Sequence, residues 1–209
     1  LRTDAERSEV YHAVALPIAP GSQVEGRIDM EKRFSDMQNH TAEHIVSGTV
    51  HALYGYDNVG FHMGSDFVTI DFDGELSWEQ LLEIERDANR AVAANYKVTA
   101  TFPTEEVLKT LEYRSKLELT ENVRIVEIEN TDICACCAPH VSSTAEVGTV
   151  RILTAERRRR GGDGVRITML CGLDAFDHEV ITDSNNAEIS MLLSAKRTET
   201  AAAVRRLIS

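Results

Sequence analysis

The sequence predicts an α+β fold, in which a mostly antiparallel sheet and a layer of helices form a two-layer sandwich. Three observations lead to this class. The expected elements run helix, strand, helix, strand, helix, strand, which is a mixed order. The stretch from Val147 to Gly172 then has the pattern of a β-hairpin. The 209 residues are 43% hydrophobic and 27% charged, which is ordinary for a globular protein that buries a sizeable core.

Residues 1–28 are expected to be a strand-rich remnant of a larger N-terminal segment. Val10–Leu16 is apolar enough for a strand, Pro17–Ser22 contains turn residues, and Val24–Ile28 fits a short second strand. Two strands alone are only marginally stable, so we expect them to pair with another part of the protein.

Residues 29–172 are expected to form the main domain. Its first helix contains no Pro and has apolar residues near helical spacing. Ser77 and Gln80 have the spacing of a capping box at the start of a second helix. The expected elements are helix Asp29–Tyr54, a loop over residues 56–64, strand Phe67–Phe72, helix Ser77–Asn95, strand Lys97–Phe102, helix Pro103–Leu117 and strand Val123–Ile128.

The end of the chain is expected to be the hairpin followed by a helical tail over residues 173–209. Its helices are rich in Ala, Leu, Glu and Arg, and a homodimer through this tail is a candidate assembly. The expected elements are hairpin strands Val147–Thr154 and Val165–Leu170 around the turn Gly161–Gly164, and tail helices Ser184–Lys196 and Glu199–Ile208.

Charge and cysteine usage narrow the class of protein. A net charge of −12 argues against non-specific nucleic-acid binding, which needs concentrated Lys and Arg. No apolar run is long enough for a membrane span, and Leu1–Asp4 is too polar to open a signal peptide. Three of the four cysteines crowd into residues 134–137, which is poor spacing for disulfides. We therefore expect a cytoplasmic protein with reduced thiols.

Two short motifs predict a metal site. His40 and His44 lie on one face of the first helix because of their i, i+4 spacing. Cys136 and His140 have the same spacing in the cysteine-rich segment. Thiolate and imidazole ligands together suit tetrahedral zinc, so we expect these four residues to bind Zn²⁺. Cys134 or Cys137 could replace Cys136, and the sequence leaves this open.

The chemistry of such a site has two interpretations. Four protein ligands would leave no open position, which is typical of a structural zinc site. Glu43, however, completes the pattern H-x-x-E-H with His40 and His44, which occurs in a class of metalloproteases with Glu as general base. Glu43 is thus a candidate catalytic residue next to His44. Solvent exposure of Glu43 without a catalytic role is the alternative.

Other histidines and one arginine run are weaker candidates. His51 and His62 are each more typical of structural histidines than of ligands, and Cys171 is expected in the core. The run Arg157, Arg158, Arg159 and Arg160 near the hairpin tip is a candidate RNA-binding patch, because Arg matches phosphate oxygens. A solvated loop tip is the alternative.

At these motifs the chain resembles the editing domain of alanyl-tRNA synthetase and the free-standing AlaX-type editing proteins. The family pattern is H-x3-H on a helix and C-x3-H about a hundred residues later, then Val, which corresponds here to Val141. The resemblance extends over roughly residues 24–172 and includes the strand within Gly64–Asp73 and the segment Gly164–Ile167, which places Arg166 among the candidate RNA-binding residues.

The resemblance implies an α+β editing domain that uses zinc to hydrolyse tRNA-Ala mischarged with serine or glycine. It also implies that residues 1–28 are the remnant of an N-terminal β-barrel. Cys137-Ala138-Pro139 replaces the Gly-Gly-Thr usual in the family, which indicates a divergent subgroup. The alternatives from the residues are a non-catalytic, zinc-stabilised RNA-binding module and, third, a metalloprotease.

Overall fold

The centre of the fold is a four-stranded antiparallel sheet with the strand order β3-β4-β9-β8. This computed structural model describes residues 2–4, 9–64, 66–115, 123–158 and 163–209. The β4–β9 register places Ile70 opposite Ile167, and both are fully buried. The strands are β3 (Asn58–Met63), β4 (Val68–Phe72), β8 (Val150–Arg157) and β9 (Val165–Cys171).

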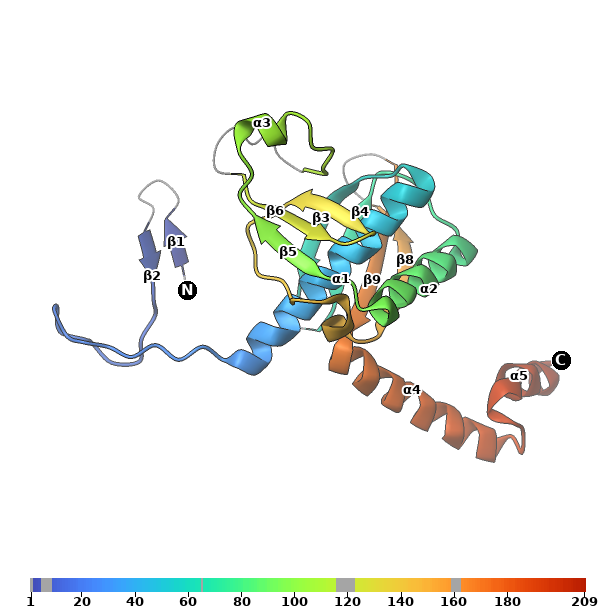
Figure 1. Cartoon of the computed structure of the whole chain (residues 1–209). Helices are drawn as coiled ribbons and strands as arrows, with labels where there is room; N and C mark the ends of the chain where they lie inside the picture. Colours follow the sequence, from blue (N-terminus) through green and yellow to red (C-terminus); the bar gives the residue numbers. More distant parts are fainter. Residues whose placement is uncertain (1, 5–8, 65, 116–122, 159–162) are drawn as a thin grey trace.

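A second antiparallel sheet contains β5 (Val98–Thr101), β6 (Ile125–Ile128) and β7 (Asp132–Ala135), in that order. Helix α1 (Met30–Tyr54) contacts β3 and β9 of the first sheet and β7 of the second. Figure 1 shows α1 crossing the middle of the molecule, where it lies beside both sheets. The predicted α+β class is confirmed, and the described strands from β3 to β9 divide into two sheets.

Helix α1 follows the sequence prediction closely. Asp29 caps its start by accepting a hydrogen bond from the backbone N–H of Lys32 at 3.1 Å. Gly55 ends it in the left-handed conformation, with φ at 69°, where glycine has no steric penalty. The helix is buried from Asn39 to Gly48, which is the stretch that contains the H-x3-H motif.

Helix α2 (Trp78–Ala94) begins with the predicted capping box of Ser77 and Gln80. Its buried face packs against α1 and β8 to complete the core. Apolar side chains from all these elements form that core, among them Ile45 and Val46 of α1, Leu81 and Ile84 of α2, and Phe72, Ile152, Ile167 and Met169 of the sheet.

Two expectations for the main domain are wrong, and one strand was not anticipated. Residues 56–64 are not a loop, because β3 occupies most of them. The helix expected from Pro103 to Leu117 is a single turn, α3 (Glu105–Leu108); residues 109–115 are not helical, and Ser115 is the last described residue before 123. The cysteine-rich segment was not assigned a strand, but it begins in β7. A 3₁₀ helix, η1 (Thr144–Val147), precedes β8.

The N-terminal segment matches its prediction only in part. A small antiparallel pair forms between β1 (Arg2–Asp4) and β2 (Glu9–Tyr11), so only the start of Val10–Leu16 is in a strand. The strand expected over Val24–Ile28 is wrong: residues 12–28 contain no helix or strand and are exposed. An isolated strand cannot satisfy its backbone hydrogen bonds, which accounts for this result.

The tail is helical as predicted, but its first helix starts earlier. Helix α4 (Gly172–Leu192) begins immediately after β9 rather than at Ser184, and Figure 1 shows it extending away from the sheets. A 3₁₀ turn, η2 (Arg197–Glu199), leads into α5 (Thr200–Ile208). The proposed boundaries at residues 28 and 172 stay predictions. In the described ranges no helix has the length and apolar character needed to cross a bilayer.

Candidate metal centre

The centre is built on the buried face of α1. His40 and His44 lie one helical turn apart, with ring centroids separated by 5.2 Å. Both side chains are buried. The ring of His40 also stacks on Phe61 of β3 at a centroid distance of 5.4 Å. The helix and β3 therefore hold the first two candidate ligands in place.

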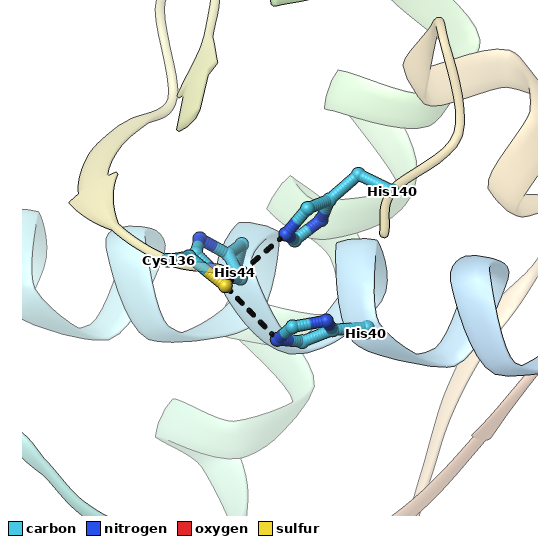
Figure 2. A group of neighbouring side chains, drawn as sticks. All are labelled: His40, His44, Cys136 and His140. Atoms are coloured by element: carbon cyan, nitrogen blue, oxygen red, sulfur yellow. Dashed lines mark hydrogen bonds between the residues drawn. The ribbon is translucent and has the colours of Figure 1, made fainter. Parts of the chain in front are cut away.

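The loop that follows β7 brings the other two candidate ligands to the same point. The thiol of Cys136 lies 3.5 Å from Nε2 of His40 and 3.4 Å from Nε2 of His140. The donor atoms of His40, His44, Cys136 and His140 all lie within 4.8 Å of one another. Figure 2 shows the three rings and the sulfur atom directed toward a common centre. The structure thus assembles the set of residues that the spacing predicted.

The hydrogen bonds of Thr41 determine which nitrogen of His140 faces the centre. The Thr41 hydroxyl donates to the backbone carbonyl of Met37 at 2.8 Å, so its oxygen accepts other hydrogen bonds. It accepts from the backbone N–H of Val141 and from Nδ1–H of His140, each at 3.2 Å. With Nδ1 of His140 held by Thr41, Nε2 is the ring nitrogen that faces Cys136.

A buried charge network orients His44. Its Nδ1–H donates to Oδ2 of Asp132 at 2.9 Å, and Nε2 is left facing the centre. Arg114 binds both oxygens of Asp132, each at 2.7 Å. Burial would raise the pKa of the Asp132 carboxyl, but the hydrogen bonds from His44 and Arg114 lower it. Asp132 is thus a buried carboxylate with cationic partners.

The same contacts favour charge separation between Cys136 and His44. Burial would raise the pKa of the Cys136 thiol, but hydrogen bonds from His140, His40 and His44 lower it to about 3. Burial would lower the pKa of His44, but its hydrogen bonds to Asp132 and Cys136 raise it to about 9. The thiolate is the form of cysteine that binds metals. Binding of a metal to the Cys136 thiolate and to His44 would release the proton from Nε2 of His44.

The neighbouring cysteines are not equivalent to Cys136. Cys137 is exposed and lies outside the group of converging donor atoms. Cys134 is buried in β7 and forms a second group with His44 and Asp132, but burial raises the pKa of its thiol to about 12. The positive charge of Arg114 beside Asp132 also disfavours a cation there. The geometry therefore favours Cys136 among the three cysteines.

Arg124 fixes the backbone of the Cys136–His140 loop. One guanidinium nitrogen, Nη1, donates to the carbonyls of Cys136 and Ala138 at 2.8 and 2.9 Å. The backbone N–H of Cys136 in turn donates to the carbonyl of Arg124 at 3.0 Å. The loop that contains Pro139 is thus held at two carbonyls by a side chain that the sequence did not single out.

Glu43 faces the centre with one of its two oxygens. Its Oε1 accepts hydrogen bonds from Ser47 at 2.8 Å and from the amide of Asn58. Its Oε2 lies 3.8 Å from Nε2 of His44 and 4.0 Å from Nε2 of His40. The side chain is only 3% exposed, so the alternative of a solvent-facing Glu43 is wrong. Asn58 was missed because its segment was predicted as loop.

The remaining candidate residues lie outside the centre. His51 forms an exposed ion pair with Asp57 at 3.1 Å, and neither His51 nor His62 belongs to the group of converging donors. Cys171 is buried as predicted, with its thiol 3.2 Å from Oδ1 of Asn39.

Two of the candidate RNA-binding arginines, Arg157 and Arg166, are engaged with acidic side chains. Arg157 pairs with Asp163 at 2.8 Å, and both are exposed. Arg166 binds both oxygens of Asp71 at 2.6 and 2.7 Å. Arg159 and Arg160 lie outside the described residues. Arg158 follows β8, and its backbone N–H donates to the carbonyl of Gly164 at 2.9 Å.

Comparisons with known proteins agree with this geometry. Residues 123–168, which contain Cys136 and His140, match the family described as the threonyl and alanyl tRNA synthetase second additional domain. The alanyl-tRNA editing protein AlaX-L of Pyrococcus horikoshii is 31% identical over 190 residues, which are 87% of this chain and 46% of that protein. Over most of its length, the chain is therefore similar to proteins named alanyl-tRNA editing proteins.

Two further proteins show a comparable degree of similarity. The alanyl-tRNA editing protein Aarsd1-A of Xenopus laevis is 29% identical, with 77% of this chain and 40% of that protein covered. The alanine-tRNA ligase of Pyrococcus abyssi is 33% identical, with 78% of this chain and 19% of that protein covered. The chain thus spans less than half the length of each of these relatives. The loop of this chain has the sequence Cys136-Cys137-Ala138-Pro139-His140.

Proposed function

We propose that the chain is an aminoacyl-tRNA deacylase that hydrolyses the ester of tRNA-Ala mischarged with serine or glycine, using zinc. The observation that supports this most strongly is the convergence of His40, His44, Cys136 and His140 within 4.8 Å. It occurs in a chain similar to proteins named alanyl-tRNA editing proteins. We also place the reaction in the cytoplasm.

The donor set fits zinc. Three imidazole nitrogens and one thiolate are ligands that Zn²⁺ binds in tetrahedral sites. Two of the three histidines have hydrogen-bond partners behind them, Thr41 for His140 and Asp132 for His44, as is usual for metal-binding histidines. When bound, zinc would polarise an ester carbonyl and lower the pKa of a nearby water molecule.

Glu43 is the residue we propose as general base. Its Oε1 is occupied by Ser47 and Asn58, so Oε2 is held toward the centre. In this position Oε2 can accept the proton of a water molecule that attacks the ester. An aminoacyl ester is already activated, so orientation and one proton acceptor suffice. His44 contributes by holding the metal, with its ring fixed by Asp132.

A non-catalytic zinc module that binds RNA is the second candidate. It is favoured by the number of ligands, because four protein donors would fill a tetrahedral zinc site. The metalloprotease has less support. Its pattern needs a distant glutamate as third ligand, whereas in the described part of the chain Cys136 and His140 complete the group.

The test of the proposed function is a deacylation panel with zinc-loaded protein. We expect Ser-tRNA-Ala to be hydrolysed faster than Ala-tRNA-Ala by about 10²-fold or more, because a hydroxyl group can be recognised by buried polar groups. His44→Ala and Cys136→Ala should be inactive. Zinc-loaded protein that hydrolyses none of the Ser-, Gly- and Ala-charged tRNAs would contradict the deacylase and favour the RNA-binding module.

We also propose that the arginines near the hairpin tip contact the phosphates of tRNA. Replacing Arg158 and Arg159 with Ala should weaken tRNA binding and reduce the slope of log affinity against log salt by about one per lost phosphate contact. Arg90→Ala on α2 is a matched control, since Arg90 is an exposed arginine paired with Asp87. Binding and salt slope equal to those of the wild type in a filter-binding series would contradict this contact.

Self-association through the tail remains part of the proposal. It is supported by large apolar side chains that are exposed on α4 and α5. They include Leu173, Phe176, Ile181, Met191, Leu192, Leu207 and Ile208.

A further inference from the structure

Asp132 occupies a position between the candidate metal centre and a buried arginine. It begins β7, is only 7% exposed, and has both carboxylate oxygens engaged. Oδ1 accepts from Nε of Arg114, and Oδ2 accepts from Nη2 of Arg114 and from Nδ1 of His44, all at 2.7 to 2.9 Å. These hydrogen bonds connect α1, β7 and the segment that contains Arg114.

The backbone of Arg114 is fixed to the same strand as Asp132. Its N–H donates to the carbonyl of Ile133 at 2.8 Å, and its carbonyl accepts from the N–H of Ala135 at 2.9 Å. Arg114 therefore lies alongside β7 in a parallel bridge with Cys134. Because its main chain and its guanidinium are both held, Arg114 fixes the orientation of the Asp132 carboxylate.

Close packing sets the distance between Asp132 and His44. Gly48 lies one turn after His44 on α1, and a Cβ atom there would be 2.6 Å from the carbonyl oxygen of Thr131 and 2.9 Å from Cβ of Asp132. Distances this short are not tolerated by real side chains, so the helix approaches β7 this closely only because residue 48 is Gly. The contact places the Asp132 carboxylate beside Nδ1 of His44.

We propose that Asp132, held by Arg114, is the positioning residue of the metal centre. By accepting the proton of Nδ1, it fixes the ring orientation of His44 and directs the lone pair of Nε2 to the metal. Arg114 supplies the opposite charge that a buried carboxylate needs and prevents it from turning toward the centre. This role rests on the proposed zinc site and explains why one of its four ligands has a carboxylate partner.

The experiment compares zinc affinity between Asp132→Asn and the wild type by competition with a chromophoric chelator. We expect affinity to fall by about 10- to 100-fold, the usual effect of removing an outer partner of a metal-binding histidine. Absorption of the Co²⁺-substituted protein should change in band position or intensity, because the geometry at His44 changes. A purely structural role would lower the stability of the protein but leave the affinity of the folded protein and the Co²⁺ spectrum unaltered.

Asp71→Asn is the matched control. Asp71 is also a carboxylate on a strand that binds both arms of an arginine, Arg166, but no candidate metal ligand contacts it. Its substitution should leave zinc affinity unchanged. Arg114→Gln, which retains Asp132 and His44, tests the same proposal if Asp132→Asn does not fold, with an expected affinity loss of about tenfold.

The outcomes separate this inference from the proposed function. Folded Asp132→Asn or Arg114→Gln with the affinity and Co²⁺ spectrum of the wild type would overturn the positioning role, even if wild-type protein binds zinc and hydrolyses mischarged tRNA. Wild-type protein that takes up no zinc would overturn the metal centre and the positioning role together. Loss of affinity with a changed spectrum, in the absence of deacylation, would support the positioning role and refute only the deacylase.

Discussion

Glu43→Gln is expected to lower the rate of Ser-tRNA-Ala hydrolysis by about 10²- to 10⁴-fold, the usual contribution of a general base. The substitution is conservative in shape. The Oε1 atom of Gln can still accept the hydrogen bonds of Ser47 and Asn58, so the side chain should stay in place. What is lost is the proton-accepting carboxylate oxygen 3.8 Å from Nε2 of His44. Single-turnover hydrolysis of labelled Ser-tRNA-Ala, with zinc content measured in parallel, gives the rate.

Glu85→Gln is the control for the loss of a buried carboxylate. Glu85 on α2 is 7% exposed and accepts hydrogen bonds from Arg151 and from the backbone N–H of Ile152. It lies outside the group of converging donors, so its substitution should leave the hydrolysis rate unchanged. A Glu43→Gln rate within a few-fold of the wild type, at full zinc content, would refute Glu43 as the base.

Removal of zinc is expected to destabilise the protein substantially. Elemental analysis should find about one zinc per chain, because the four donor atoms form one group. A metal present at 100 times its dissociation constant stabilises the folded state by about 2.7 kcal/mol. For a protein of this size, this corresponds to a fall in Tm of about 5–11 °C when a chelator removes the zinc. Differential scanning calorimetry with and without chelator measures this change in Tm.

Two cysteine variants sharpen this test. Cys136→Ser should reduce zinc affinity, because the thiolate ligand is lost. The chelator should therefore lower the Tm of this variant much less than the Tm of the wild type. Cys137→Ser should behave as the wild type, since Cys137 is adjacent in sequence but exposed and outside the group. Protein that contains no zinc and takes none up on titration would contradict the metal centre.

The sequence predicted those parts of the structure that depend on local signals. The capping box of α2, at Ser77 and Gln80, consists of contacts within three residues, so it can be recognised in the sequence. The i, i+4 spacing of His40 and His44 likewise fixes their relative position once the helix forms. The equal spacing of Cys136 and His140 completed the predicted set of candidate ligands, but it left Cys134 and Cys137 as alternatives to Cys136.

Features that depend on tertiary contacts could not be predicted in this way. Strand β3 contains Gly60 and a bulge at Asn58–Gly60, which obscure the alternation expected of a strand. Arg114 and Asp132 meet only because an extended segment, expected to be helix, lies along β7. The preference for Cys136 over Cys134 also follows from the strand, whose alternation buries Asp132 and Cys134 and ends before Cys136.

The two halves of the metal centre are far apart along the chain, and this has a kinetic consequence. Cys136 and His40 are separated by 96 positions, so their approach requires the closure of a long loop. Such non-local contacts are costly to form early in folding. We expect the ligand set to be completed only after α1 and β7 have docked. Interactions made after the main folding barrier slow unfolding rather than speed folding, so zinc bound at this centre would mainly prolong the lifetime of the folded molecule.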